Sequence, residues 1–276
     1  MNYYSYDELI NDIKRLIKEY NGLLESEVIG YSVLGRAIPM LRVGCGHINM
    51  FICAGIHGRE SINTELLIKI TRRYLKKYCN HVYFSKYCFN IIPLLNPDGY
   101  TYAMTQSDYY EYKHNYNNID INRDFPSVLW QKSIVTGKTS ASQPETKALI
   151  SAFKSHPSIM FVDIHSRGNC IYYYRKTMDS AYNKRQLLMA QILAKYTGYI
   201  LLEPDFEIGD NDTGGNSVHY YSEKYKMPAF TIETCDDNQA FPIERETVNE
   251  VYDKMSRLPE AMINSLFYCN KQFDLF

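Results

Sequence analysis

Four strongly apolar segments, each short enough to be a strand, alternate with helix-like segments along the chain. They are INMFICAG at 48–55, YCFNIIPLL at 87–95, IMFVDIH at 159–165 and PAFTIE at 228–233. Their nearly continuous apolar character is typical of strands that are buried on both faces of a sheet. Because alternating strands and helices build parallel or mixed sheets, the chain is predicted to form a single α/β domain over residues 1–276.

The helices around these strands are predicted from apolar residues at helical spacing and from capping residues. They are expected at 5–20, 61–78, 143–153, 180–196, 216–225 and 244–268. The third of these should open at Ser142 and Pro144. A hairpin is expected over 28–43 and a turn at Asn96-Pro97-Asp98-Gly99. Residues 100–142 show little periodicity, which predicts a long irregular segment of the kind that usually carries function.

The charge balance and the apolar pattern argue against several classes of protein. The chain has 30 Lys+Arg against 31 Asp+Glu and a formal net charge of -1, so a nucleic-acid partner is not expected. No apolar run approaches the roughly 18 residues that a membrane span requires. The N-terminal segment shows no secretion signal, so a cytoplasmic location is expected unless a leader was removed. The seven cysteines lack a CxxC pair, which argues against a disulfide framework or a thiolate zinc site.

Candidate metal ligands lie at the end of one predicted strand and just after another. His57 and Glu60 occur in AGIHGRE, and His165 occurs in FVDIHSRG. The His-x-x-Glu pair alone is a weak signal, because such pairs often occur by chance and a solvated loop is the more common explanation. However, polar groups at the carboxyl ends of neighbouring strands meet at one edge of an α/β sheet. Two histidines and one carboxylate, with a position left for water, are the ligand set expected for catalytic zinc.

Two further segments carry candidate catalytic and binding groups. Glu233 ends the apolar run of PAFTIETC, where it is either an exposed strand-end residue or a general base for a metal-activated water. Asn122 and Arg123 lie in NIDINRDFP, where apolar and polar residues alternate. Arginine can grip a carboxylate through two parallel hydrogen bonds, so Arg123 is a candidate for binding a substrate carboxylate.

The motifs GIHGRE, NPDGY, IDINRDFP, SQPETKA, VDIHS and FTIET occur in the same order as those of the zinc carboxypeptidase family, and the chain resembles that family from about residue 27 to 245. The resemblance implies one Zn²⁺ per chain, held by His57, Glu60 and His165, with Glu233 as the catalytic base. It also implies that Asn122 and Arg123 clamp a substrate carboxylate, and that Arg59 contacts substrate. The implied fold is a twisted mixed sheet of about eight strands flanked by helices.

The sequence departs from the family pattern in two places. Aligning YKHNYNNIDINRDF with the family's Trp-Arg-x-Asn pattern puts Lys113 where an arginine normally polarises the scissile carbonyl. Lysine keeps the positive charge but loses the planar fork. The tyrosine that the family carries a few residues before a Gly-Gly pair is missing, because Asp210-Asn211-Asp212-Thr213 precedes Gly214-Gly215. Tyr220 and Tyr221 follow the glycines and are interpreted as helix packing.

Within the family, IGYSVLGRAIPMLRVG and the compact length resemble the bacterial γ-D-glutamyl-diamino-acid peptidases of cell-wall peptides. The leading hypothesis is therefore a zinc peptidase that hydrolyses an amide next to a free carboxylate in muropeptides. A general metallocarboxypeptidase acting on L-peptides, and a zinc-binding protein that recognises peptide termini without cleaving them, are the alternatives. The acidic stretch at 203–215 either faces the amine of a diamino acid or is a solvated loop.

Overall fold

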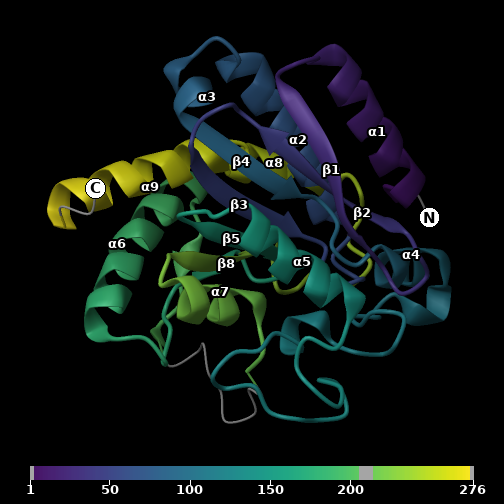
Figure 1. Cartoon of the computed structure of the whole chain (residues 1–276). Helices are drawn as coiled ribbons and strands as arrows, with labels where there is room; N and C mark the ends of the chain where they lie inside the picture. Colours follow the sequence, from purple (N-terminus) through teal and green to yellow (C-terminus); the bar gives the residue numbers. More distant parts are fainter. Residues whose placement is uncertain (1–2, 205–213, 274–276) are drawn as a thin grey trace.

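The computed structural model describes residues 3–204 and 214–273, which form one eight-stranded sheet with helices on both faces (Figure 1). The strands lie in the order β1-β2-β4-β3-β5-β8-β6-β7. Their bounds are β1 Leu24–Tyr31, β2 Ala37–Val43, β3 Ile48–Ala54, β4 Tyr87–Ile92, β5 Phe161–Ser166, β6 Cys170–Tyr172, β7 Ile200–Leu201 and β8 Ala229–Thr234. The central strands β4, β3, β5 and β8 are mutually parallel. Strand β2 is antiparallel to β4 on one side, strand β6 is antiparallel to β8 on the other, and β1 and β7 form the edges. The predicted mixed sheet is therefore confirmed.

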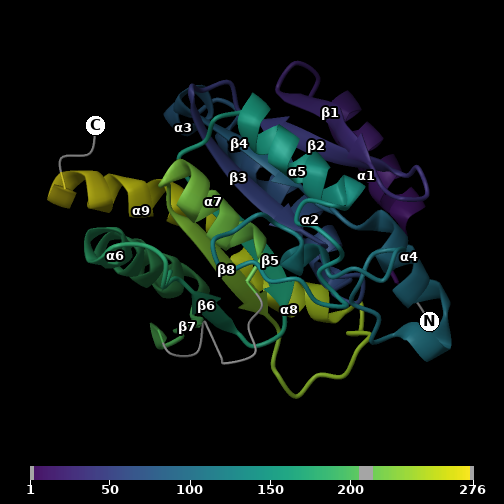
Figure 2. The ribbon, with the colours of Figure 1, turned by 60° about the horizontal axis from the view of Figure 1, so that its bottom comes forward.

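Helices cover both faces of this sheet. The helices and the two short 3-10 turns are α1 Tyr6–Glu19, α2 Ile62–Tyr78, α3 Val82–Lys86, α4 Pro97–Thr105, η1 Ser107–Tyr109, η2 Ile121–Arg123, α5 Pro144–Ser155, α6 Ser180–Thr197, α7 Ser217–Tyr225, α8 Thr247–Met255 and α9 Leu258–Phe273. Helices α5 and α7 pack on one face, and α1, α2, α6, α8 and α9 pack on the other (Figure 2). None of the helices among the described residues is long and apolar enough to cross a membrane.

Strand β3 shows why the central strands are apolar throughout. Met50 and Ile52 belong to the core on the α2 face, whereas Phe51 and Cys53 belong to the core under α5 and α7. Successive side chains of a strand point to opposite faces, so a strand covered by helices on both sides needs an apolar residue at every position. Because β3 runs parallel to β4 and β5, it ends at the same edge of the sheet as they do, and the loop with His57 and Glu60 follows it there.

Two predicted elements differ in the structure. The turn predicted at Asn96–Gly99 is the start of α4, because Asn96 Oδ1 accepts a hydrogen bond of 2.9 Å from the Gly99 N–H and caps the helix. The single closing helix predicted at 244–268 is wrong, since α8 and α9 occupy this region. Pro259 has no N–H to donate to the carbonyl of Met255, so α8 cannot continue through it.

The segment between α4 and α5 is irregular, as predicted, and a buried carboxylate holds its end in place. Asp124 is fully buried and accepts hydrogen bonds from the backbone N–H groups of Ser142 and Gln143, at 3.0 and 2.9 Å. Helix α5 begins at Pro144 with Gln143 as its N-cap. Ser142 was predicted to open the helix, but it lies one residue before the N-cap. The same segment contains η2 and so carries the candidate clamp residues toward the sheet edge.

Candidate metal centre and active site

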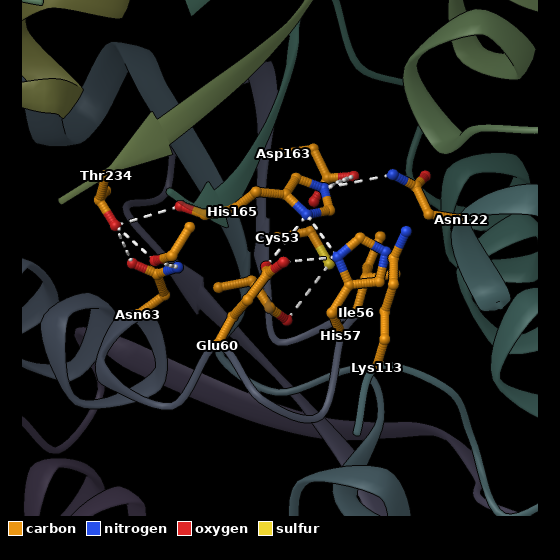
Figure 3. A network of polar contacts seen from close by, with 12 residues as sticks. Cys53, Ile56, His57, Glu60, Asn63, Lys113, Asn122, Asp163, His165 and Thr234 are labelled. Atoms are coloured by element: carbon orange, nitrogen blue, oxygen red, sulfur yellow. Dashed lines mark hydrogen bonds and ion pairs between the residues drawn. The ribbon is translucent and has the colours of Figure 1, made fainter. Parts of the chain in front are cut away.

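Three side chains with metal-binding atoms meet at the carboxyl ends of the neighbouring parallel strands β3 and β5 (Figure 3). His57 Nδ1 lies 2.6 Å from Glu60 Oε1, and His165 Nδ1 lies 3.1 Å from both His57 Nδ1 and Glu60 Oε2. All three residues are buried. Burial alone would raise the pKa of Glu60, but the two histidines outweigh it and lower the pKa to about 2. The structure thus brings the three predicted ligands to one point, with the carboxylate ionised.

Each of the two imidazoles has its other nitrogen beside a second carboxylate. His57 Nε2 lies 3.3 Å from Asp120 Oδ1, and His165 Nε2 lies 3.2 Å from Asp163 Oδ2. A carboxylate at this position favours the tautomer that carries its proton on Nε2 and leaves the Nδ1 lone pair for a metal. Two such lone pairs 3.1 Å apart repel one another unless a cation lies between them. The donor set therefore fits Zn²⁺ and leaves a position for water.

Asp120 and Asp163 are the two residues of this cluster that were not predicted from the sequence. Burial alone would raise the pKa of Asp120, yet His57 and Lys113 hold it well below its usual range. Asp163 is fully buried; its Oδ2 accepts a hydrogen bond from the Ser217 hydroxyl, and its Oδ1 has no partner.

A sequence signal for Asp163 was available. It precedes His165 by two residues in a strand, and residues at this spacing point to the same face. The link between Asp120 and His57 depends on the fold of the irregular segment, and no local pattern in the sequence reveals it.

Glu233 lies on β8 directly opposite His165 in the pairing of β5 with β8. Its Oε2 is shielded from solvent and has no hydrogen-bond partner. Burial, only partly offset by His165, raises the pKa of Glu233 to about 8. A divalent cation held by the neighbouring ligands would act in the opposite direction. Glu233 lines a cavity of about 300 Å³ together with His57 and Glu60, so an unpaired carboxylate faces the same space as the metal-binding atoms.

Lys113 and Arg59 line the same cavity. Lys113 Nζ lies 2.8 Å from Asp120 Oδ2, so its ammonium group is anchored by the carboxylate that also contacts His57. Arg59 Nη1 donates a hydrogen bond of 3.0 Å to Glu111 Oε2 at the exposed rim. Both cations therefore lie at the cavity that also contains Glu233.

Asn122 and Arg123 lie on η2, next to the metal-binding cluster. Asn122 Nδ2 is 3.4 Å from His165 Nε2, and its Oδ1 accepts a 3.0 Å hydrogen bond from the Ser217 N–H at the start of α7. Arg123 Nη1 donates to the Asn122 carbonyl oxygen at 2.8 Å. In the described part of the chain, neither residue lines the cavity that contains Glu233. The structure therefore places the candidate clamp beside His165 but outside the cavity that Arg59 and Lys113 line.

Two sequence-based interpretations concern the segment around the glycine pair. The positions where the family tyrosine is missing, Asp210 to Thr213, and most of the acidic stretch at 203–215 lie outside the described residues. Tyr220 and Tyr221 are buried among aromatic rings of the core, with Tyr221 4.9 Å from the Phe153 ring centroid, so their interpretation as helix packing is confirmed.

Known proteins share both sequence and fold with this chain. A family model described as zinc carboxypeptidase matches residues 9–257. Mouse carboxypeptidase M is 28% identical over 166 residues, covering 55% of this chain and 36% of the mouse protein, so the chain spans just over a third of that relative.

Two solved structures show the same fold. Bovine thrombin-activatable fibrinolysis inhibitor in complex with tick carboxypeptidase inhibitor superposes with a TM-score of 0.83 at 20% identity, covering 97% of this chain and 98% of that chain. Murein-tripeptide amidase from Escherichia coli O157 gives a TM-score of 0.59 at 20% identity, covering 85% of this chain and 91% of that chain. Because the family model spans the motifs, the sheet and all three metal-binding residues, the chain belongs to the zinc carboxypeptidase family.

Proposed function

We propose that the protein is a zinc-dependent peptidase that hydrolyses an amide bond next to a free carboxylate, and that its substrates are muropeptides with a γ-D-glutamyl-diaminopimelate bond. The observation that carries the proposal is the shared cavity, where the unpaired Glu233 carboxylate faces His57 and Glu60 of the ligand cluster. Binding alone would not require a carboxylate at this position, whereas hydrolysis requires a base for the attacking water.

The residues divide the chemistry as follows. His57, Glu60 and His165 would hold a zinc ion, which when bound would act as a Lewis acid toward water and the substrate carbonyl. Glu233 takes the proton of the attacking water and returns it to the leaving amine. Lys113 faces the cavity as a fixed positive charge and stabilises the oxygen on which negative charge develops. Because Asp120 holds both Lys113 and His57, it couples the position of this charge to that of the metal ligand.

The free carboxylate of the substrate is assigned to Arg123 and Asn122. Arg123 is oriented by its hydrogen bond to the Asn122 carbonyl, and Asn122 is fixed by the Ser217 N–H. A carboxylate bound beside His165 would place the adjacent amide bond near Glu233, which pairs with His165 across the sheet. This arrangement supports exopeptidase action, since an internal peptide bond offers no carboxylate at that distance.

The muropeptide substrate is supported by the sequence resemblance of residues 29–44 and by a relative with this fold. That relative is by name a murein-tripeptide amidase. Two other functions are alternatives to the muropeptide peptidase. A general carboxypeptidase acting on L-peptides is favoured by the match to mouse carboxypeptidase M. A non-catalytic binder of peptide termini is favoured by Lys113 in place of arginine.

The three functions are separated by one comparison of substrates. Zinc-loaded protein is incubated with L-Ala-γ-D-Glu-diaminopimelate and with hippuryl-type L-peptides, and products are identified by mass spectrometry. Release of diaminopimelate supports the proposal, release of L-amino acids alone supports the general carboxypeptidase, and binding without either product supports the binder. Metal analysis should find about one zinc per chain, the number that a single ligand cluster holds, and His165→Ala should lose most of it.

A further inference from the structure

The wall of the cavity carries two arginines that share one aromatic ring. The guanidinium carbons of Arg59 and Arg167 lie 4.6 and 4.8 Å from the centroid of the Phe241 ring. All three residues line the cavity with Glu233. Phe241 is buried and packs into the core, so it provides a rigid surface for both cations. Two positive charges are therefore held close together at the edge of the site.

Arg167 differs from the other cations of the cavity in its partners. Lys113 is paired with Asp120, and Arg59 with Glu111. Arg167 Nε donates a hydrogen bond of 2.7 Å to the Asp237 carbonyl oxygen, but its Nη1 is shielded from solvent and has no partner. Among the described residues, no carboxylate forms an ion pair with Arg167. A shielded guanidinium N–H without an acceptor is unfavourable, so an acceptor from a ligand would relieve it.

The position of Arg167 indicates which part of a substrate it faces. Arg167 follows the ligand His165 by two residues and lies on the cavity wall, whereas Arg123 lies outside that wall on η2. If Arg123 holds the carboxylate of the leaving amino acid, the cavity wall that contains Arg167 faces the other side of the scissile bond. That side is the residue that supplies the scissile carbonyl. Asp237 also lines this wall and would favour an amine, but the two guanidinium groups outnumber it.

We propose that Arg167, together with Arg59 on the Phe241 ring, binds a second carboxylate of the substrate, located on the residue that supplies the scissile carbonyl. The inference rests on the proposed function and specifies its substrate. A glutamate linked through its γ-carbonyl keeps its α-carboxylate free, and this group can reach the arginines. The same residue amidated to isoglutamine cannot offer a carboxylate, and an α-linked peptide offers one only when the equivalent residue has an acidic side chain.

The test compares matched substrates that differ in one group. The kcat/KM of zinc-loaded protein is measured on L-Ala-γ-D-Glu-diaminopimelate and on its isoglutamine counterpart, and on acyl-L-Glu and acyl-L-Gln dipeptides. The wild-type protein should prefer each free acid. Arg167→Gln should lower the acid-to-amide ratio by roughly 10-fold, the scale of one charge-assisted hydrogen bond, and Arg167→Lys should restore part of it. Arg72→Gln removes an exposed arginine of α2 that does not line the cavity, and it should leave the ratio unchanged.

Two outcomes in the variants would overturn the inference. Equal losses on acid and amide in Arg167→Gln would mean that the arginine only supports the wall. A loss of selectivity in Asp237→Asn but not in Arg167→Gln would mean that the wall binds an amine. Cleavage of the L-peptides alone would reject the muropeptide substrate, yet the acid-to-amide ratio of that pair would still test Arg167. If no substrate is cleaved, calorimetric binding of the same pairs to the zinc-loaded protein measures the selectivity directly.

Discussion

Replacing Asp163 with asparagine tests the idea that buried carboxylates prepare both histidines for zinc. The substitution keeps the shape of the side chain but removes the charge that lies 3.2 Å from His165 Nε2. An amide NH₂ turned toward Nε2 favours the tautomer with its proton on Nδ1, the atom that faces His57 and Glu60. Loss of such a partner typically lowers metal affinity 10- to 100-fold, or about 1.4–2.7 kcal/mol, and we expect a loss in this range for Asp163→Asn.

The assay is a competition titration of zinc against a chromophoric chelator at fixed pH and ionic strength. Asp120→Asn should show a loss of similar size through His57, because its carboxylate lies 3.3 Å from the Nε2 of that residue. Asp237→Asn is the matched control, since this aspartate lines the cavity without a hydrogen bond or ion pair to either histidine in the described chain. Thermal unfolding of the zinc-free variants separates damage to the fold from loss of affinity. Wild-type zinc affinity in Asp163→Asn would refute the reasoning.

Three further results are expected. Glu233→Gln should retain zinc and fold normally but lose roughly 10²-fold or more in turnover, which steady-state kinetics and metal analysis together would show. Arg123→Lys keeps the charge but loses the fork, so kcat/KM on a substrate with a free terminal carboxylate should fall roughly 10- to 150-fold, with almost no fall for its terminal amide. Burial would raise the pKa of Glu260, but Arg73 and Tyr78 outweigh it and lower the pKa below 4.5. The carboxylate therefore adds stability above its unfolded pKa that is lost as pH falls through the lower folded pKa. Glu260→Gln should accordingly lower the melting temperature near neutral pH and reduce its decline on acidification, and an unchanged acid profile would contradict this assignment.

The metal-binding residues could be predicted from the sequence because their positions follow from a local rule. His57 and Glu60 lie in the loop that follows β3, and His165 is the second-last residue of β5. Parallel strands place their carboxyl ends at one edge of the sheet, so the three side chains had to approach one another once these strands were neighbours. Glu233 was predictable in the same way, since it lies near the end of β8 beside β5.

Local sequence patterns predicted the secondary structure less well where the same residues are compatible with two different structures. Asn96-Pro97-Asp98-Gly99 has the composition of a turn, but the same residues cap and begin a helix when apolar residues follow that can be buried. The apolar periodicity near the C-terminus continued past Pro259 and suggested one helix. Because Pro259 has no N–H to continue the helical hydrogen bonds, the region forms two helices, α8 and α9.

The sequence by itself determined that four apolar strands alternate with helices, and that His57, Glu60, His165 and Glu233 lie at or just after strand ends, because each of these features depends on residues close together in the chain. The surroundings of these groups were decided only by the tertiary structure. Asp120, in the irregular segment, contacts His57. Arg59 and Arg167 both stack on Phe241, although these three residues are far apart in the sequence. Such contacts have no sequence period, since they arise from how loops pack at the end of the sheet, where neither strand alternation nor helical spacing dictates which residues become neighbours.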